Sequence, residues 1–94
     1  MAVRVLIHRE VPDKVNPQLN KLLIKMRSLA VQQPGYISGE TLKKVSSHHI
    51  HLVISSWKNL DDWEGWLALK ERQETQAEID LLLGQETTYE VFHH

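Results

Sequence analysis

The segment His49–Trp57 constrains the fold more than any other, because as a β-strand it carries apolar side chains on both faces. One face is formed by an uninterrupted apolar set, which consists of Ile50, Leu52 and Ile54. The other face mixes polar residues with Val53 and Trp57. A strand that is apolar on both faces requires cover on both, and a chain of 94 residues supplies only enough helix for one. We therefore expect a second copy of the chain to cover the other face.

The remaining sequence contains three further strand patterns. Residues 3–10 are rich in β-branched side chains and nearly alternate, which predicts a strand with its odd-numbered residues on one side. A strand over 36–45 is expected to form a hairpin with His49–Trp57 across a short polar break at 46–48. A last alternating segment spans 87–92 and predicts the final strand.

Polar caps, proline and glycine mark the ends of the helical regions. Asn16-Pro17 supplies an N-cap residue followed by proline at the first helical position, and Gln33-Pro34-Gly35 ends that helix. Between them, apolar residues recur three and four apart, as on one face of an amphipathic helix. Asn59 caps a second helix, and a further helical stretch over 73–83 ends at Gly84.

The elements therefore follow in the order β-α-β-β-α-β along a single domain, residues 1–94. This order is typical of the split-βαβ or ferredoxin-like fold, which belongs to the α+β class. In that fold a four-stranded antiparallel sheet carries both helices on one face. The bare face is then the one that a second copy must cover.

Charge and composition exclude several classes of function. Lysine plus arginine number 11 and aspartate plus glutamate 12, so the formal charge is −1, and no basic stripe is available for nucleic acid. The chain has no cysteine, which excludes disulfides, thiolate catalysis and Cys-ligated metal clusters. No apolar run approaches the ~20 residues of a membrane span, and the first residues resemble neither a signal nor a transit peptide. We therefore expect a cytoplasmic protein that binds neither nucleic acid nor membrane.

Five short strings stand out along the chain. They are Pro34-Gly35-Tyr36-Ile37-Ser38-Gly39, Ser56-Trp57, Trp63-Glu64-Gly65-Trp66-Leu67, Glu71-Arg72 and Tyr89-Glu90-Val91-Phe92. In this order and spacing they resemble the antibiotic-biosynthesis monooxygenase (ABM) family of dimeric α/β-barrel proteins. The resemblance implies a homodimer in which two ferredoxin-like subunits pack sheet against sheet. It also implies a ligand pocket in each subunit, between the sheet and the helices.

The resemblance implies a small cofactor-independent monooxygenase that acts on a quinol-like or polyphenolic aromatic substrate. The family also contains haem-degrading enzymes, which use an Asn near the end of the first strand, a Trp in the second helix and a later axial His. Trp66 matches that Trp, but His8 stands at the Asn position and the axial position falls near Gln76. The alternative is a non-catalytic module that binds a small hydrophobic or haem-like ligand, and isomerisation of a small keto-sugar is a third reading.

His8 and Trp66 are the predicted catalytic residues. His8 ends the first strand and, where its side chain reaches the cleft between sheet and helices, takes a phenolic proton near neutral pH. Its alternative role is that of a surface or hydrogen-bonded structural histidine. Trp66 follows Trp63 by three residues on one helix, so both indoles lie on the inner face, where they either pack in the core or stack on a flat ligand.

Substrate-binding roles are predicted for Tyr36, Trp63, Arg72 and His51. Tyr36 lies at the mouth of the cleft and either hydrogen-bonds a ligand oxygen or anchors the start of its strand. Arg72 either binds an acidic substrate group or neutralises a helix C-terminus. His49 and His51 share one strand face, but a zinc or iron site needs a third ligand and none is identifiable, so no metal site is predicted.

Overall fold

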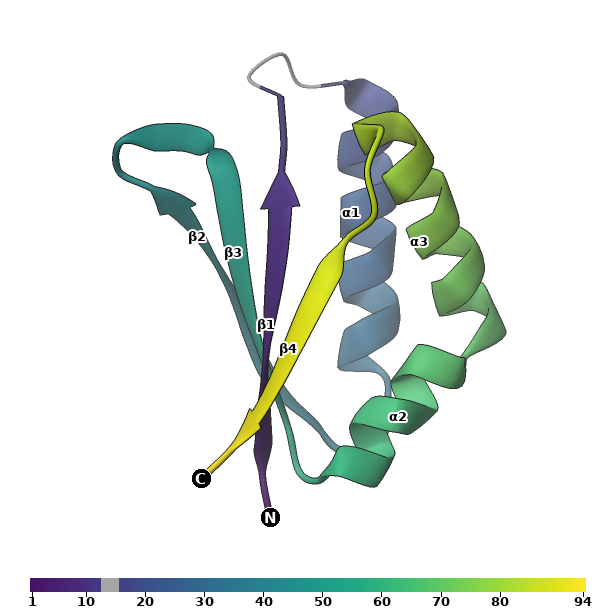
Figure 1. The fold of residues 1–94 in the computed structure, drawn as a ribbon. Coiled ribbons are helices and arrows are strands. Elements are labelled where there is room, and N and C mark those ends of the chain that lie inside the picture. The colour runs from purple at the N-terminus through teal and green to yellow at the C-terminus, as the bar shows by residue number, and fades with distance from the viewer. Residues whose placement is uncertain (13–15) are drawn as a thin grey trace.

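The computed structural model describes residues 1–12 and 16–94, which form one sheet with helices on one side of it (Figure 1). The strands are β1 (Val3–Glu10), β2 (Tyr36–Lys44), β3 (Ser47–Trp57) and β4 (Thr88–His93). The helices are α1 (Pro17–Val31), α2 (Leu60–Ala68) and α3 (Lys70–Leu83). None of these described helices is long and apolar enough to cross a membrane. Both chain ends lie at the end of the sheet next to α2.

Neighbouring strands all run antiparallel, and their order across the sheet is β2-β3-β1-β4. This is the ferredoxin-like arrangement that the sequence predicts, and the prediction is confirmed. The second helical region differs, because Leu69 has an extended backbone (φ −65°, ψ 123°) and divides it into α2 and α3. The order is therefore βαββααβ, and α3 begins at Lys70, before the predicted range 73–83. The break lets the Leu69 side chain pack against the core.

The hairpin and the helix caps follow from local signals in the sequence. The turn between β2 and β3 is shorter than the predicted break, so β3 begins at Ser47. Asn16 Oδ1 accepts the backbone N–H of Gln18 at 2.9 Å, and Asn59 Oδ1 accepts that of Asp62 at 2.8 Å. These bonds satisfy N–H groups that a helix start leaves without partners.

Gly35 joins α1 to β2 in a backbone conformation that favours glycine. Its φ is 81°, and an added Cβ would overlap the Asp62 carboxylate. We therefore expect Gly35→Ala to lower the free energy of unfolding by more than about 1 kcal/mol in chemical denaturation, the usual cost of left-handed backbone for an L-residue. Gly84→Ala is the matched control, because its φ is 72° with open space around the added Cβ. Equal losses in the two variants would rule out the steric contribution of Asp62.

The helix-facing side of the sheet forms the core. Its buried apolar residues come from β1, β3 and all three helices, and they are Val3, Val5, Ile7, Leu19, Leu22, Met26, Trp57, Trp63, Trp66 and Ile79. The two-residue spacing on β1 and the three- and four-residue spacing on α1 are the patterns expected of a half-buried strand and an amphipathic helix. The odd-numbered residues of β1 therefore lie under the helices.

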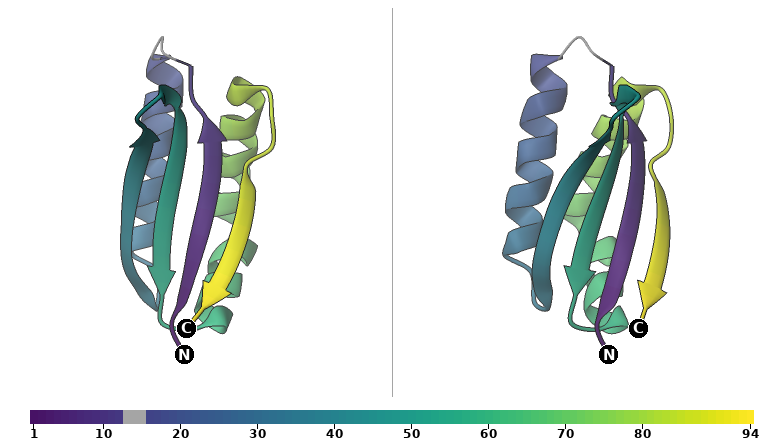
Figure 2. Two further views of the ribbon diagram at one scale, coloured as in Figure 1. Left: turned by 60° about the vertical axis from the view of Figure 1, so that its left-hand side comes forward. Right: turned by 90° about the vertical axis from the view of Figure 1, so that its left-hand side faces the viewer.

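The opposite side of the sheet, which we call the outer face, is covered by none of the described helices (Figure 2). Its apolar residues are Leu6, Leu42, Ile50, Leu52, Ile54 and Phe92. Leu42 and Phe92 are 46% and 50% exposed. The accessible surface of 6337 Å² exceeds the roughly 5,600 Å² expected of a compact monomer of 10.9 kDa. The prediction that both faces are apolar is confirmed, and cover by a second copy stays a prediction.

Candidate functional site

A cavity of about 290 Å³ lies between α1 and the helix-facing side of β1, β2 and β3. Its walls are largely apolar, and the residues that form them include Ile7, Leu23, Met26, Ala30 and Val53. The lining also includes polar and charged side chains, which are Arg9, Asn20, Arg27, Glu40, Thr41, His51 and Ser55. An apolar body with a few polar groups at fixed positions is typical of small-molecule sites.

The aromatic end of the cavity is formed by Trp66, Tyr36 and Ser55. Trp66 stacks on the buried Trp57, with ring centroids 6.0 Å apart and an interplanar angle of 25°. Tyr36 meets the same ring edge-on at 5.4 Å. Trp57 Nε1 donates a hydrogen bond to Ser55 Oγ at 2.8 Å. These contacts fix the plane of the Trp66 indole, which leaves an ordered aromatic wall in the cavity.

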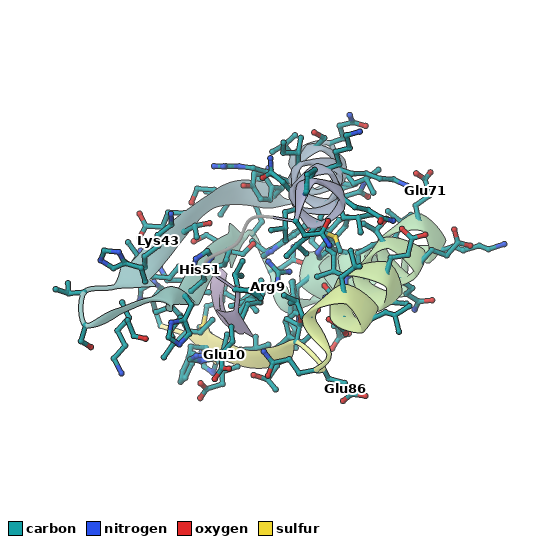
Figure 3. The ribbon with its side chains drawn as sticks, turned by 90° about the horizontal axis from the view of Figure 1, so that it is seen from above. Arg9, Glu10, Lys43, His51, Glu71 and Glu86 are labelled. Atoms are coloured by element: carbon teal, nitrogen blue, oxygen red, sulfur yellow. The ribbon has the colours of Figure 1, made fainter. Side chains whose placement is uncertain are left out.

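The basic end is a row of three side chains on adjacent strands. Arg9 of β1 lies opposite His51 of β3, which in turn lies opposite Lys43 of β2. Seen from above, the three residues follow one another across neighbouring strands, from Lys43 through His51 to Arg9 (Figure 3). Arg9 and His51 line the cavity, and Lys43 is exposed beside them.

Arg9 is a half-buried cation without a carboxylate partner in the described part of the chain. The ion pairs found there are His8–Glu90 and Lys70–Glu74. Arg9 Nε is buried and donates no hydrogen bond. Burial lowers the pKa of its guanidinium, which still remains protonated at neutral pH. The basic end therefore holds a positively charged guanidinium whose Nε–H donor has no acceptor among the described residues.

His51 is the titratable base of the cavity. Its pKa is lowered from the ordinary value, mainly by burial and then by the positive charge of Lys43, and a backbone hydrogen bond at His48 opposes this in part. At neutral pH the imidazole is therefore uncharged, and one ring nitrogen is available to accept a proton.

Three of the predicted site residues line the cavity, namely Trp66, Tyr36 and His51. Trp63 does not, because it is 2% exposed and packs edge-on against Trp57 and Tyr89 at centroid distances of 5.9 and 5.7 Å. Its position matches the core-packing alternative. Trp63 contributes no surface to this cavity, so it cannot contact a substrate bound there.

Arg72 also lies outside the cavity lining. It is buried in the first turn of α3, donates to the Tyr89 hydroxyl and lies 5.2 Å from the centroid of that ring. The Tyr89 hydroxyl donates in turn to Gln76 Oε1 at 3.0 Å. Gln76, near the axial position of the haem-degrading pattern, donates to Asp80 and Thr87 at 2.8 and 2.9 Å. These residues form a polar network between α3 and β4.

His8 lies on the outer face, so the prediction that it reaches the cleft is wrong. The buried residues of β1 are odd-numbered, and alternation turns His8 to the opposite side. Its Nε2 lies 2.9 Å from Glu90 Oε1 on β4, and its side chain is 49% exposed. This arrangement is that of the hydrogen-bonded structural histidine, and it removes His8 from contact with a ligand in the cavity.

Arg9 and Lys43 are the basic-end residues that sequence analysis missed. Arg9 continues the odd-numbered positions of β1, which the structure places on the helix-facing side. Lys43 becomes a neighbour of His51 only through the β2–β3 register, which shifts between Tyr36 and Ser38. A short sequence pattern does not reveal such a shift.

The histidine pair on β3 does not form part of a metal-ligand set within residues 1–12 and 16–94. No group of three His, Asp or Glu side chains there is close enough to hold a metal ion. His49 is exposed, and its Nδ1 lies 3.0 Å from Ser47 Oγ. The cavity therefore offers a ligand an imidazole, a guanidinium, hydroxyl groups and an aromatic wall.

Comparison with known proteins assigns the family. The model of the antibiotic biosynthesis monooxygenase family matches residues 2–78, and the chain belongs to this family. A conserved protein from Methanosarcina mazei has a similar structure, with a TM-score of 0.86, 15% identity, and coverage of 99% of this chain and 92% of that one. SnoaB, a cofactor-independent oxygenase from Streptomyces nogalater, has a TM-score of 0.82 and 14% identity, and the match covers 99% of this chain and 92% of SnoaB. At such identities the likeness shows a common fold. A search of curated proteins found no match.

Proposed function

We propose that this protein is a small cofactor-independent monooxygenase that acts on a quinol-like or polyphenolic aromatic substrate. Membership of the monooxygenase family supports this reaction class, and SnoaB, which has the same fold, is a cofactor-independent oxygenase. The observation that carries the proposal is that one cavity joins the Trp66 indole to the uncharged imidazole of His51.

In the proposed mechanism, His51 replaces His8 as the proton acceptor. The substrate ring stacks against Trp66, and the Tyr36 hydroxyl hydrogen-bonds a substrate oxygen. His51 takes a phenolic proton, which makes the ring electron-rich enough to react with oxygen. The apolar walls keep water away from the anion that forms.

The substrate itself supplies every electron that the reaction needs. A quinol and one O₂ give a hydroxyquinone and one water, so the O–O bond breaks and a ring C–H bond becomes a C–O bond. The quinol loses four electrons and O₂ gains four. No external reductant is required.

We also propose that the working form is a homodimer joined through the outer faces. The exposed apolar side chains Leu42 and Phe92 and the large accessible surface of the single chain support it. Sheet-to-sheet packing would give β3 its second cover. It would also stiffen the sheet on which the cavity is built.

Oxygen uptake tests the proposed reaction. Chelator-treated protein is given a panel of reduced naphthoquinones and anthrones in a closed oxygen-electrode cell, with heat-denatured protein as the control. We expect consumption at least about a hundredfold above the uncatalysed rate, the scale of general base catalysis. No uptake across the panel, with tryptophan fluorescence quenched by the same compounds, would favour the non-catalytic binding module instead.

A further inference from the structure

We propose that the cavity takes a planar aromatic acid, whose carboxylate is held by Arg9 and whose rings lie toward Trp66. This rests on the proposed function, because it names the substrate class of the same cavity. Quinol oxidation does not itself require a carboxylate. The preference for an acid is therefore a separate property with its own test.

The first support is the charge of the basic end. Arg9 is half-buried, its Nε makes no hydrogen bond, and the described residues give it no ion pair. Burying a charge is costly unless a group of opposite sign compensates it. A guanidinium presents donors in a planar fork that matches the two oxygens of a carboxylate. Lys43 and the His51 ring extend this donor row across two more strands.

The second support is the position of the acidic groups. The negative charge of Asp80 on α3 offsets part of the decrease in the Arg9 pKa that burial causes. Asp80 Oδ1 accepts hydrogen bonds from Gln76 and from the Thr87 hydroxyl, each at 2.8 Å. Glu40 belongs to the cavity lining, yet its register on β2 assigns it to an outer-face position. No carboxylate of the described residues forms an ion pair with Arg9, although Asp80 and Glu40 lie in its surroundings.

The third support is the shape of the cavity. The two ends lie at His51 and Ser55 on β3, and four residues of strand span about 13 Å. Its volume of about 290 Å³ lies at the lower limit of ligand pockets, roughly 300–1,000 Å³. Ile7, Val53 and Thr41 lie between the basic end and the aromatic end. These dimensions suit two fused rings with one carboxylate at the edge.

The experiment compares 2-naphthoate with its neutral amide, 2-naphthamide, by titration calorimetry at low ionic strength. The two probes share a shape and differ in charge. We expect wild-type protein to bind naphthoate at least about tenfold more tightly, because hydrogen bonds to charged groups are the stronger class. Equal or tighter binding of the amide would overturn the proposal, and so would failure of both probes to bind.

Variants connect the preference to Arg9. Arg9→Gln should bring naphthoate affinity down to that of the amide and leave amide affinity within about twofold, and Arg9→Lys should keep part of the preference. Lys43→Gln, at an exposed position, should weaken naphthoate binding by about two- to threefold even if the Arg9 variants fold poorly. Lys44→Gln is the matched control and should change nothing. A preference that survives intact in folded Arg9→Gln would contradict the assignment.

The two proposals fail separately. Oxygen uptake with neutral quinols and no preference for naphthoate would keep the monooxygenase and overturn the acid site. A clear naphthoate preference that Arg9→Gln removes, in a protein that consumes no oxygen, would keep the acid site and overturn the monooxygenase.

Discussion

Replacing His51 by glutamine is expected to lower kcat/KM for quinol oxidation by roughly 10²- to 10⁴-fold, the contribution of a positioned general base. Glutamine is close in size and still forms hydrogen bonds, but it cannot accept the phenolic proton. Because burial and Lys43 lower the pKa of His51, the neutral base is already present at pH 7. In the wild type, kcat/KM should be constant above pH 7 and fall on acidification as His51 is protonated, with a midpoint below about 6.5.

Two histidine variants are the controls for this prediction. His48→Gln changes an exposed residue on the same strand and should keep the wild-type rate and pH profile. His8→Gln changes the outer face, where the imidazole is bonded to Glu90. Loss of the acidic limb in His8→Gln, with full activity in His51→Gln, would contradict our assignment and return the catalytic role to His8.

Leu52→Glu is expected to convert the dimer into monomers. Leu52 lies at the centre of the outer face, opposite Leu42 on one side and His8 on the other. In a two-fold symmetric interface the change buries two carboxylates near one another, and each carries a desolvation cost of several kcal/mol. Light scattering should give twice 10.9 kDa for the wild type and 10.9 kDa for the variant.

Leu81→Glu is the matched control for the dimer. Leu81 is 82% exposed on α3, so the same loss of apolar surface and gain of charge occur away from the outer face. This variant should keep the wild-type mass. A wild-type mass of 10.9 kDa would contradict the dimer proposal outright, and a dimeric Leu52→Glu would place the interface elsewhere.

The fold was predictable because its signals are local. Asn16 and Asn59 cap helices through bonds within three residues, and Gly84 ends α3 through a left-handed backbone. The break at Leu69 was not predictable in this way. Its extended backbone carries no local stop signal in the sequence, and its side chain packs against a core that exists only in the folded chain.

Site residues could be predicted only where the sequence itself indicates which side of a helix or strand faces the core. Trp66 was placed on the single apolar side of its helix, and Tyr36, which follows Pro34-Gly35, at the mouth of the cleft; both line the cavity. On β1 both sides carry apolar residues, Val5 on one and Leu6 on the other, so alternation could not decide which one faces the helices. His8 was misplaced for this reason, and Arg9 was overlooked for the same reason.

The fate of molecular oxygen tests the central claim most directly. Chelator-treated protein is allowed to turn over a quinol under ¹⁸O₂, and the product is analysed by mass spectrometry. A monooxygenase acting as proposed places one labelled atom in the hydroxyquinone and the other in water, and His51→Gln forms little labelled product. A product that carries no label from ¹⁸O₂, or that takes its new oxygen from labelled water, would contradict the account.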